Sequence, residues 1–147
     1  MPYNVRMLYK DFLKSLTGCP FCGGENRIIS DTESAYLTYA LAPYHKHHLL
    51  ILPKRHTESI QDITEQEDKD IEQLQRLGMS LLKKLGYESI TFLVREGGLN
   101  EIKSVAHIHY HLIPKIQIGD LDHYGQERRI LSDEEIQGTV HDIELYL

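Results

Sequence analysis

The 147-residue sequence has only two cysteines, no long apolar run and no excess of positive charge. No stretch approaches the roughly 18 consecutive apolar residues that a membrane-spanning helix needs, so we expect no such helix. The N-terminus lacks the basic and apolar segments of a secretory signal, and the cytoplasm is therefore the expected location. The net charge of −6 argues against a broad basic surface for long nucleic acids.

The two cysteines, Cys19 and Cys22, lie in the turn-forming sequence Cys-Pro-Phe-Cys-Gly-Gly. A reducing compartment leaves such a close pair for metal binding or redox chemistry rather than for a structural disulfide. A glutaredoxin-like site needs a helix that begins at the second cysteine, and Gly23 and Gly24 would break that helix. A zinc site, in which the turn directs both thiolates at one ion, fits better. Two buried cysteines without any ligand are the remaining alternative.

Apolar residues recur at helical spacing in three segments. The first lies within residues 1–17. The second begins at a capping box that starts with Thr64 and ends near Leu85, before Gly86. The third begins at Ser132 and extends towards the end of the chain. A length of 147 residues is typical of one domain, so we expect a single domain over residues 1–147.

Four segments have the apolar and β-branched composition of strands, namely residues 35–41, 49–52, 89–96 and 105–114. The first two are separated by a short turn and the last two by a Gly-rich loop, so each pair is expected to form a hairpin. The predicted fold class is therefore α+β, with an antiparallel sheet of about five strands and a long helix packed on it.

Three histidines alternate with apolar residues in the last of these segments: His107, His109 and His111. A strand would place the three rings on one face, with neighbours roughly 6 to 7 Å apart. Solvated strand faces usually carry Thr, Lys, Glu and Ser, so the row indicates a functional site. Imidazole serves two chemistries, metal binding and nucleophilic or acid–base catalysis.

Two blocks, residues 104–114 and 48–56, together resemble the histidine triad (HIT) family of nucleotide hydrolases and transferases in residue type, order and separation. The resemblance extends from Cys19 to Pro114 and leaves residues 115–147 as a C-terminal extension. It implies the HIT fold and a homodimer. In zinc-carrying members, two cysteines and two histidines hold the metal, which implies a closed structural Zn²⁺ site here. Its ligands would be Cys19, Cys22, His56 and His107.

The resemblance also implies a mechanism in which His109 attacks the α-phosphorus of a nucleoside phosphate derivative. The resulting nucleotidyl-histidine would then be resolved by water or another acceptor. His111 would bind the phosphate oxygens, with protonated imidazole stabilising negative charge, and Ser104 would hydrogen-bond the phosphoryl group. His48 would form part of the pocket wall and contact the substrate. His45 and His47 are expected to be solvated loop residues.

Three positions depart from the common family pattern. Ala40 stands where many relatives have an acidic residue for the ribose hydroxyls, Lys103 replaces a Gln, and Arg95 replaces an Asn of the phosphate pocket. Lys103 and Arg95 are therefore expected to bind substrate and to favour dinucleoside polyphosphates over phosphoramidates. The alternative function is a zinc-stabilised module that binds nucleotide or a partner without turnover. The intact triad favours the enzyme.

Overall fold

The computed structural model describes residues 8–147 apart from 23–27, 99–102, 117–118, 121 and 123. The chain divides into two compact units, Met1–Ile116 and Gln117–Leu147, and the second nearly coincides with the expected C-terminal extension. Among the described residues, no helix is both long enough and apolar enough to cross a membrane.

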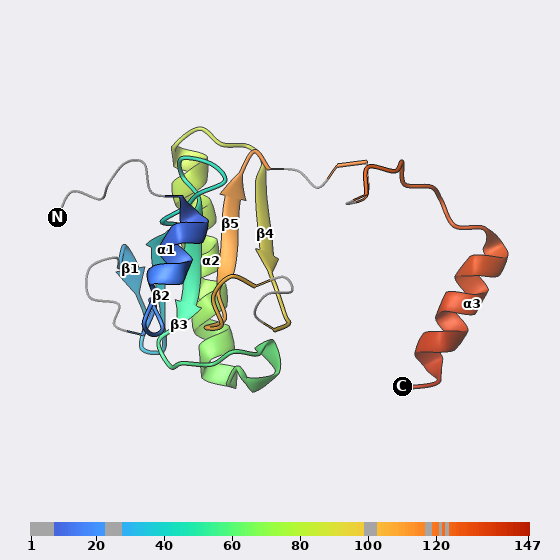
Figure 1. The fold of residues 1–147 in the computed structure, drawn as a ribbon, viewed down its shortest axis with the longest axis horizontal. Helices are drawn as coiled ribbons and strands as arrows, with labels where there is room; N and C mark the ends of the chain where they lie inside the picture. The colour runs from blue at the N-terminus through green and yellow to red at the C-terminus, as the bar shows by residue number, and fades with distance from the viewer. Residues whose placement is uncertain (1–7, 23–27, 99–102, 117–118, 121, 123) are drawn as a thin grey trace. The chain divides into compact units, whose positions relative to one another are not determined.

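The first unit contains a five-stranded antiparallel sheet with the strand order β1-β2-β3-β5-β4 (Figure 1). The α+β class and both predicted hairpins, β2 with β3 and β4 with β5, are confirmed. The short β1 strand was not assigned from the sequence, because two residues carry no periodic pattern. The strands are β1 Ser30–Asp31, β2 Ala35–Tyr39, β3 Leu49–Pro53, β4 Ile90–Val94 and β5 Tyr110–Pro114.

Helix α2, Glu65–Lys84, packs on one face of this sheet. The predicted capping box is present, since the Thr64 hydroxyl accepts from the Glu67 N–H and the Glu67 carboxylate accepts from the Thr64 N–H. The helix ends at Lys84 with Leu85 as its C-cap, and Gly86 follows with φ of +98°. Burial of apolar side chains such as Leu74 and Leu82, each 1% exposed, stabilises the unit by about 1.5–3 kcal/mol per side chain.

The opposite face of the sheet carries a smaller cluster of Tyr36, Leu50 and Leu52, against which Phe21 and Ala40 pack. His111 lies opposite Leu50 in the register of β5 and β3. Its side chain therefore belongs to the face that α2 does not cover. The same face is crossed by α1, Tyr9–Ser15, which Figure 1 shows in front of the strands.

The prediction of one strand through residues 105–114 is wrong in its first half, because β5 begins only at Tyr110. The register of β3 and β5 would place Ile108 opposite Pro53, which has no N–H to donate to a ladder. The Pro53 carbonyl instead accepts from the side chain of His107, and the Ile108 N–H donates to the Thr57 carbonyl. His107 and His109 therefore lie in an irregular segment rather than on one strand face.

The remaining helices are the short 3₁₀ helix η1, Ile60–Asp62, and α3, Asp133–Glu144, in the second unit. Helix α3 confirms the helix predicted after Ser132, whose hydroxyl accepts from the Glu135 N–H in a capping box. The lead-in helix predicted within residues 1–17 corresponds to α1, with residues 1–7 outside the described part of the chain.

Candidate functional site

A cavity of about 320 Å³ lies on the face of the sheet that α2 does not cover. Both polar groups and aromatic rings line it. The polar residues are His48, Arg95, Ser104, His109 and His111, and the aromatic residues are Tyr9, Phe12, Phe21 and Tyr44. The cavity thus combines groups that bind an anion with an apolar wall that suits a planar base.

His109 is held in a single ring orientation by the backbone. Its Nδ1 lies 2.9 Å from the carbonyl oxygen of His107, and because a carbonyl oxygen can only accept, Nδ1 carries the proton. In the neutral ring the lone pair is therefore on Nε2. Burial lowers the pKa of His109, with Lys103 and Arg95 adding smaller contributions in the same direction, so the ring is neutral at neutral pH. A neutral imidazole with a free Nε2 lone pair is the nucleophilic form.

His111 is oriented by a chain of hydrogen bonds through His48. The backbone N–H of Tyr44 donates to His48 Nδ1 at 3.2 Å, so the neutral His48 ring carries its proton on Nε2. That Nε2–H donates to His111 Nδ1 at 2.9 Å. The neutral His111 ring therefore carries its own proton on Nε2, which is left as a hydrogen-bond donor.

Both rings of this pair are neutral near pH 7, contrary to the expectation of a protonated histidine beside the phosphate. The pKa of His48 is lowered to about 4 and that of His111 to about 3, chiefly by burial and then by the positive charge that His109 carries once acid protonates it. His111 therefore meets an anion as a neutral N–H donor. A bound phosphate would raise its pKa, because an adjacent negative charge favours the protonated ring.

The two cations expected at the substrate lie in different surroundings. Arg95 lines the cavity. Lys103 is outside the residues that line it, is 6% exposed, and its ammonium donates to the carbonyl oxygens of Glu58 and Ala106. Lys103 thus joins the loop after His56 to the segment that carries the triad. The geometry gives it a structural environment rather than a place in the pocket.

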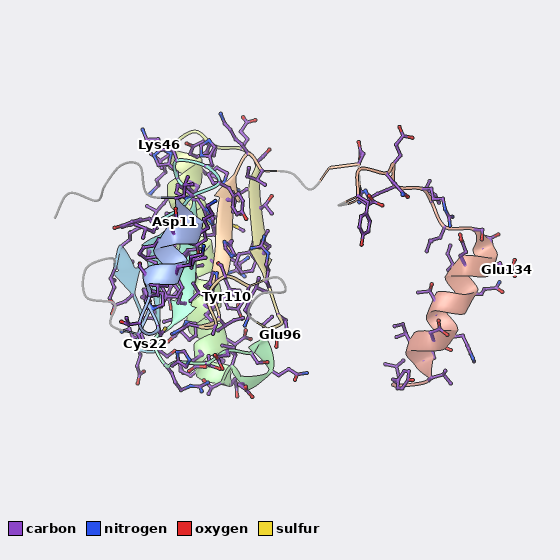
Figure 2. The ribbon with its side chains drawn as sticks, viewed as in Figure 1. Asp11, Cys22, Lys46, Glu96, Tyr110 and Glu134 are labelled. Atoms are coloured by element: carbon purple, nitrogen blue, oxygen red, sulfur yellow. The ribbon has the colours of Figure 1, made fainter. Side chains whose placement is uncertain are left out.

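Four residues predicted as metal ligands come together at one point: Cys19, Cys22, His56 and His107. Their ligand atoms all lie within 4.8 Å of one another. The Sγ–Nδ1 distances are 3.4 Å for Cys19 and His107, 3.5 Å for Cys22 and His107, and 3.1 Å for Cys22 and His56. Figure 2 shows Cys22 towards the end of the first unit at which α2 begins.

These distances suit a tetrahedral ion. Zn–S bonds of about 2.3 Å and Zn–N bonds of about 2.0–2.1 Å give S···N edges of roughly 3.5 Å. His107 is also set in the required tautomer, since its Nε2–H donates to the Pro53 carbonyl at 2.9 Å and leaves the Nδ1 lone pair directed at the thiols. Burial, followed by the contact with Cys19, raises the pKa of Cys22 to about 11, so a cation must displace its proton.

Helix α1 precedes the cysteine pair, whereas a glutaredoxin-like motif follows a strand. Both thiols also have partners, since Cys19 contacts His107 and Cys22 contacts His56. These contacts argue against the alternative of two buried cysteines without any ligand. Among the described residues, the arrangement therefore favours metal binding.

Sequence reasoning missed the contribution of α1 to the cavity. The Tyr9 hydroxyl lies 2.9 Å from Ser104 Oγ, and Phe12 lines the same space. A helical stripe of aromatic residues could have indicated a pocket wall, but nothing in the sequence pairs that helix with residues almost a hundred positions away.

The expectation that His45 and His47 are solvated is also wrong. His47 Nδ1 lies 2.5 Å from the Tyr87 hydroxyl, and the His45 ring packs edge-on against the Tyr87 ring at 5.2 Å between centroids. Both histidines are half-buried.

Comparison with known proteins agrees with this geometry. The family model described as HIT domain matches residues 24–118, which is more than half of the chain. The chain is 27% identical over 129 residues to an uncharacterized HIT-like protein of Methanocaldococcus jannaschii, covering 82% of this chain and 99% of that protein. It is 29% identical over 97 residues to a bis(5'-adenosyl)-triphosphatase of Dictyostelium discoideum, covering 65% of this chain and 64% of that protein.

Among solved structures, a member of the HIT family from Bacillus subtilis superposes with a TM-score of 0.67 at 21% identity. The similarity covers 88% of this chain and 97% of that one. At this identity the likeness shows a shared fold. Together with the family match, it shows that the chain belongs to the histidine triad (HIT) family.

Proposed function

We propose that this HIT protein is a nucleotide hydrolase or nucleotidyl transferase that acts at the α-phosphorus of a nucleoside phosphate derivative. The observation that carries the proposal is the hydrogen bond from His109 Nδ1 to the His107 carbonyl, because it leaves an Nε2 lone pair on a neutral, half-buried ring that lines the cavity. Such a ring is a competent nucleophile towards phosphorus.

In the proposed first step, His109 Nε2 forms a bond to the α-phosphorus while the bond from phosphorus to the leaving group breaks. The His111 Nε2–H donates to the phosphoryl oxygens, on which negative charge is concentrated. In the second step, water or another acceptor hydroxyl attacks phosphorus and gives up its proton to solvent, and the P–N bond breaks, which releases the nucleotide and restores His109. Ser104, on the wall of the same cavity, offers a further hydroxyl to the phosphoryl group.

The proposed substrate class is a dinucleoside polyphosphate, ahead of a nucleoside phosphoramidate. Arg95 supplies a permanent cation to the cavity wall, and Ala40 supplies no acceptor for ribose hydroxyls. A chain of phosphates gains more from that cation than a neutral leaving group does. The D. discoideum relative, named as a bis(5'-adenosyl)-triphosphatase, supports the same class. The buried position of Lys103 leaves Arg95 as the cation on which this preference depends.

The proposed cofactor is a structural Zn²⁺ held by Cys19, Cys22, His56 and His107. Three of their S···N distances, 3.4, 3.1 and 3.5 Å, support a tetrahedral site. Bound there, zinc would tie the N-terminal turn to the triad segment. The phosphoryl chemistry itself would be carried out by His109 and His111 in the neighbouring cavity.

A homodimer and a cytoplasmic location also belong to this proposal. Strand β4 lies at one end of the sheet order, and we propose that it is the strand that pairs with a second copy. Light scattering across micromolar concentrations should give the mass of two chains. A stable mass of one chain would remove this part of the proposal.

The test of function is a panel of diadenosine polyphosphates and adenosine phosphoramidate, assayed with the wild type and His109→Asn. Acid quenching should trap a nucleotidyl-protein in the wild type. His109→Asn should keep the fold and bind nucleotide while losing turnover by several orders of magnitude, because the covalent route is removed. A wild type that binds nucleotide without turnover would identify a binding module instead. A fully active His109→Asn variant would refute the mechanism.

A further inference from the structure

Tyr9 and Ser104 are 95 residues apart in sequence, and their hydroxyl oxygens lie 2.9 Å apart on the cavity wall. Tyr9 is the first residue of α1, and the ring of Phe12, one turn later, stacks near it with 6.3 Å between centroids and 19° between planes. Both rings line the cavity that contains His109 and His111. The pair thus joins α1 to the polar part of the site.

The rest of α1 makes fewer specific contacts than Tyr9 does. None of its residues is buried, and no side chain caps its N-terminus. Leu13 and Leu16, at its C-terminal end, line a second cavity of about 280 Å³ beside Cys19, His56 and His107. The Tyr9 hydroxyl is therefore the point at which α1 makes a directed polar contact with the triad segment, within the described residues.

The chemistry of two hydroxyls decides how this contact works. Each has one proton and two lone pairs, so a bond between them uses one proton and leaves the other free. A phenol is far more acidic than an aliphatic hydroxyl, which makes Tyr9 the better donor and Ser104 the acceptor. The Ser104 proton then remains free. Its hydroxyl no longer turns its proton towards Tyr9, so the proton is available to another acceptor.

We propose that Tyr9 is a positioning residue for phosphoryl recognition, because it fixes the Ser104 hydroxyl so that this hydroxyl donates to a phosphoryl oxygen in the cavity. The inference rests on the proposed function only for the identity of the ligand as a nucleotide phosphate. An ordered donor costs less entropy to engage than a freely turning one, so Tyr9 strengthens binding through Ser104 and not by contact with the ligand.

The test is a double-mutant cycle on AMP binding, measured by calorimetry with the zinc-loaded 147-residue chain. Tyr9→Phe keeps the ring and its stacking on Phe12 but removes the hydroxyl. It should weaken AMP binding by about threefold to tenfold, the effect of losing one hydrogen bond. In a Ser104→Ala background the same change should have no effect. In a Ser104→Thr background, which restores a hydroxyl, the effect should return.

The matched control is Tyr146→Phe, the same chemical change on a side chain that is 90% exposed in the second unit, and it should leave AMP binding unchanged. Unchanged or tighter AMP binding by Tyr9→Phe would overturn the inference. Tighter binding would indicate that the Tyr9 hydroxyl competes with AMP for Ser104. An equal loss in the Ser104→Ala background would overturn it too, since Tyr9 would then contact the ligand directly. A wild type that binds no AMP also contradicts it.

Failure of this inference can be distinguished from failure of the proposed function, because the binding cycle needs no turnover. If the cycle gives the expected coupling but acid quenching traps no nucleotidyl-histidine, Tyr9 positions Ser104 in a site that only binds. If the adduct forms and Tyr9→Phe binds as the wild type does, the catalytic proposal stands and the role of Tyr9 is refuted.

Discussion

His48 Nε2 and His111 Nδ1 share a 2.9 Å hydrogen bond between two buried rings, and both rings are uncharged at neutral pH. The bond needs one neutral donor and one neutral acceptor, so a proton added to the acceptor nitrogen would replace the hydrogen bond by two opposed N–H groups. The pair is therefore a part of the fold that acid should disrupt.

The first prediction is a loss of stability in acid. The folded pKa values of about 4 and about 3 lie below the ordinary histidine pKa of 6.5, so the unfolded chain binds protons first. The stabilisation from the pair is fully present above pH 6.5 and decreases as pH falls towards 4, by about 2 to 4 kcal/mol at pH 5. Denaturant unfolding at pH 7.5 and 5 measures it. A His48→Gln/His111→Gln double variant should lose less stability over this interval, and an equal loss in both proteins would contradict the assignment.

The second prediction concerns His111 as a transition-state donor. His111→Ala removes a neutral Nε2–H and should lower kcat by about 10²- to 10³-fold, as loss of one such donor typically does. Single-turnover kinetics with diadenosine triphosphate would measure the chemical step. His141→Ala, on α3 in the second unit, serves as the matched control and should leave kcat unaffected. A reduction below threefold in His111→Ala would exclude the role.

The third prediction is that metal removal lowers stability. Purified protein should contain about one zinc per chain, and chelation should lower Tm by about 5 to 10 °C, because the ligands join the N-terminal turn to two other segments. Added zinc should restore Tm in the wild type but not in Cys19→Ser/Cys22→Ser. Metal analysis and thermal denaturation test this directly. An unaltered Tm in the double variant would show that the cluster holds no structural metal.

The fourth prediction uses the close packing of α2 on β5. A Cβ on Gly78 would lie 2.5 Å from Leu112 Cδ1, a side chain with no exposed surface. Overpacking lowers the free energy of unfolding by about 1–3 kcal/mol, whereas the higher helix propensity of alanine raises it by about 1 kcal/mol. Gly78→Ala should therefore be destabilising by roughly 1 kcal/mol. At Gly138 of α3 a Cβ meets nothing within 4 Å, and the same substitution there should stabilise the helix. Stabilisation by Gly78→Ala would show that Leu112 can move aside.

The fifth prediction tests the substrate class through Arg95. Arg95→Gln removes the cation from the cavity wall and should raise KM for diadenosine triphosphate by about 10-fold, the effect of one charge-assisted hydrogen bond. The KM for adenosine phosphoramidate should change by less than threefold. Arg76→Gln is the control, since Arg76 pairs with Glu72 on the exposed surface of α2. Equal effects on both substrates would refute the preference for polyphosphates.

Much of the fold follows from local sequence signals. The capping boxes at Thr64 and Ser132 specify helix starts through short-range hydrogen bonds, and both are present. Two hairpins follow from pairs of apolar segments, one pair separated by a short turn and the other by a Gly-rich loop. The start of β5 at Tyr110 was missed because it depends on Pro53, a residue on another strand.

Side-chain chemistry indicated a metal site at the cysteine pair, and the resemblance to zinc-carrying HIT proteins supplied the two histidines. The four residues, Cys19, Cys22, His56 and His107, do converge. The burial of Lys103 was not predictable, since it depends on carbonyl groups of Glu58 and Ala106 that the fold brings within reach of the ammonium. The placement of Tyr9 at Ser104 likewise depends on tertiary structure alone.

His107 serves two centres with different parts of the same residue. Its ring lies among the proposed metal ligands, while its main-chain carbonyl accepts from Nδ1 of His109 and sets the tautomer of the nucleophile. If zinc binds there as proposed, its loss would release the ring, and we expect the resulting shift of the adjoining peptide to inactivate the chain before it unfolds. Zinc supply would then govern how much of the protein is active, independently of how much is made.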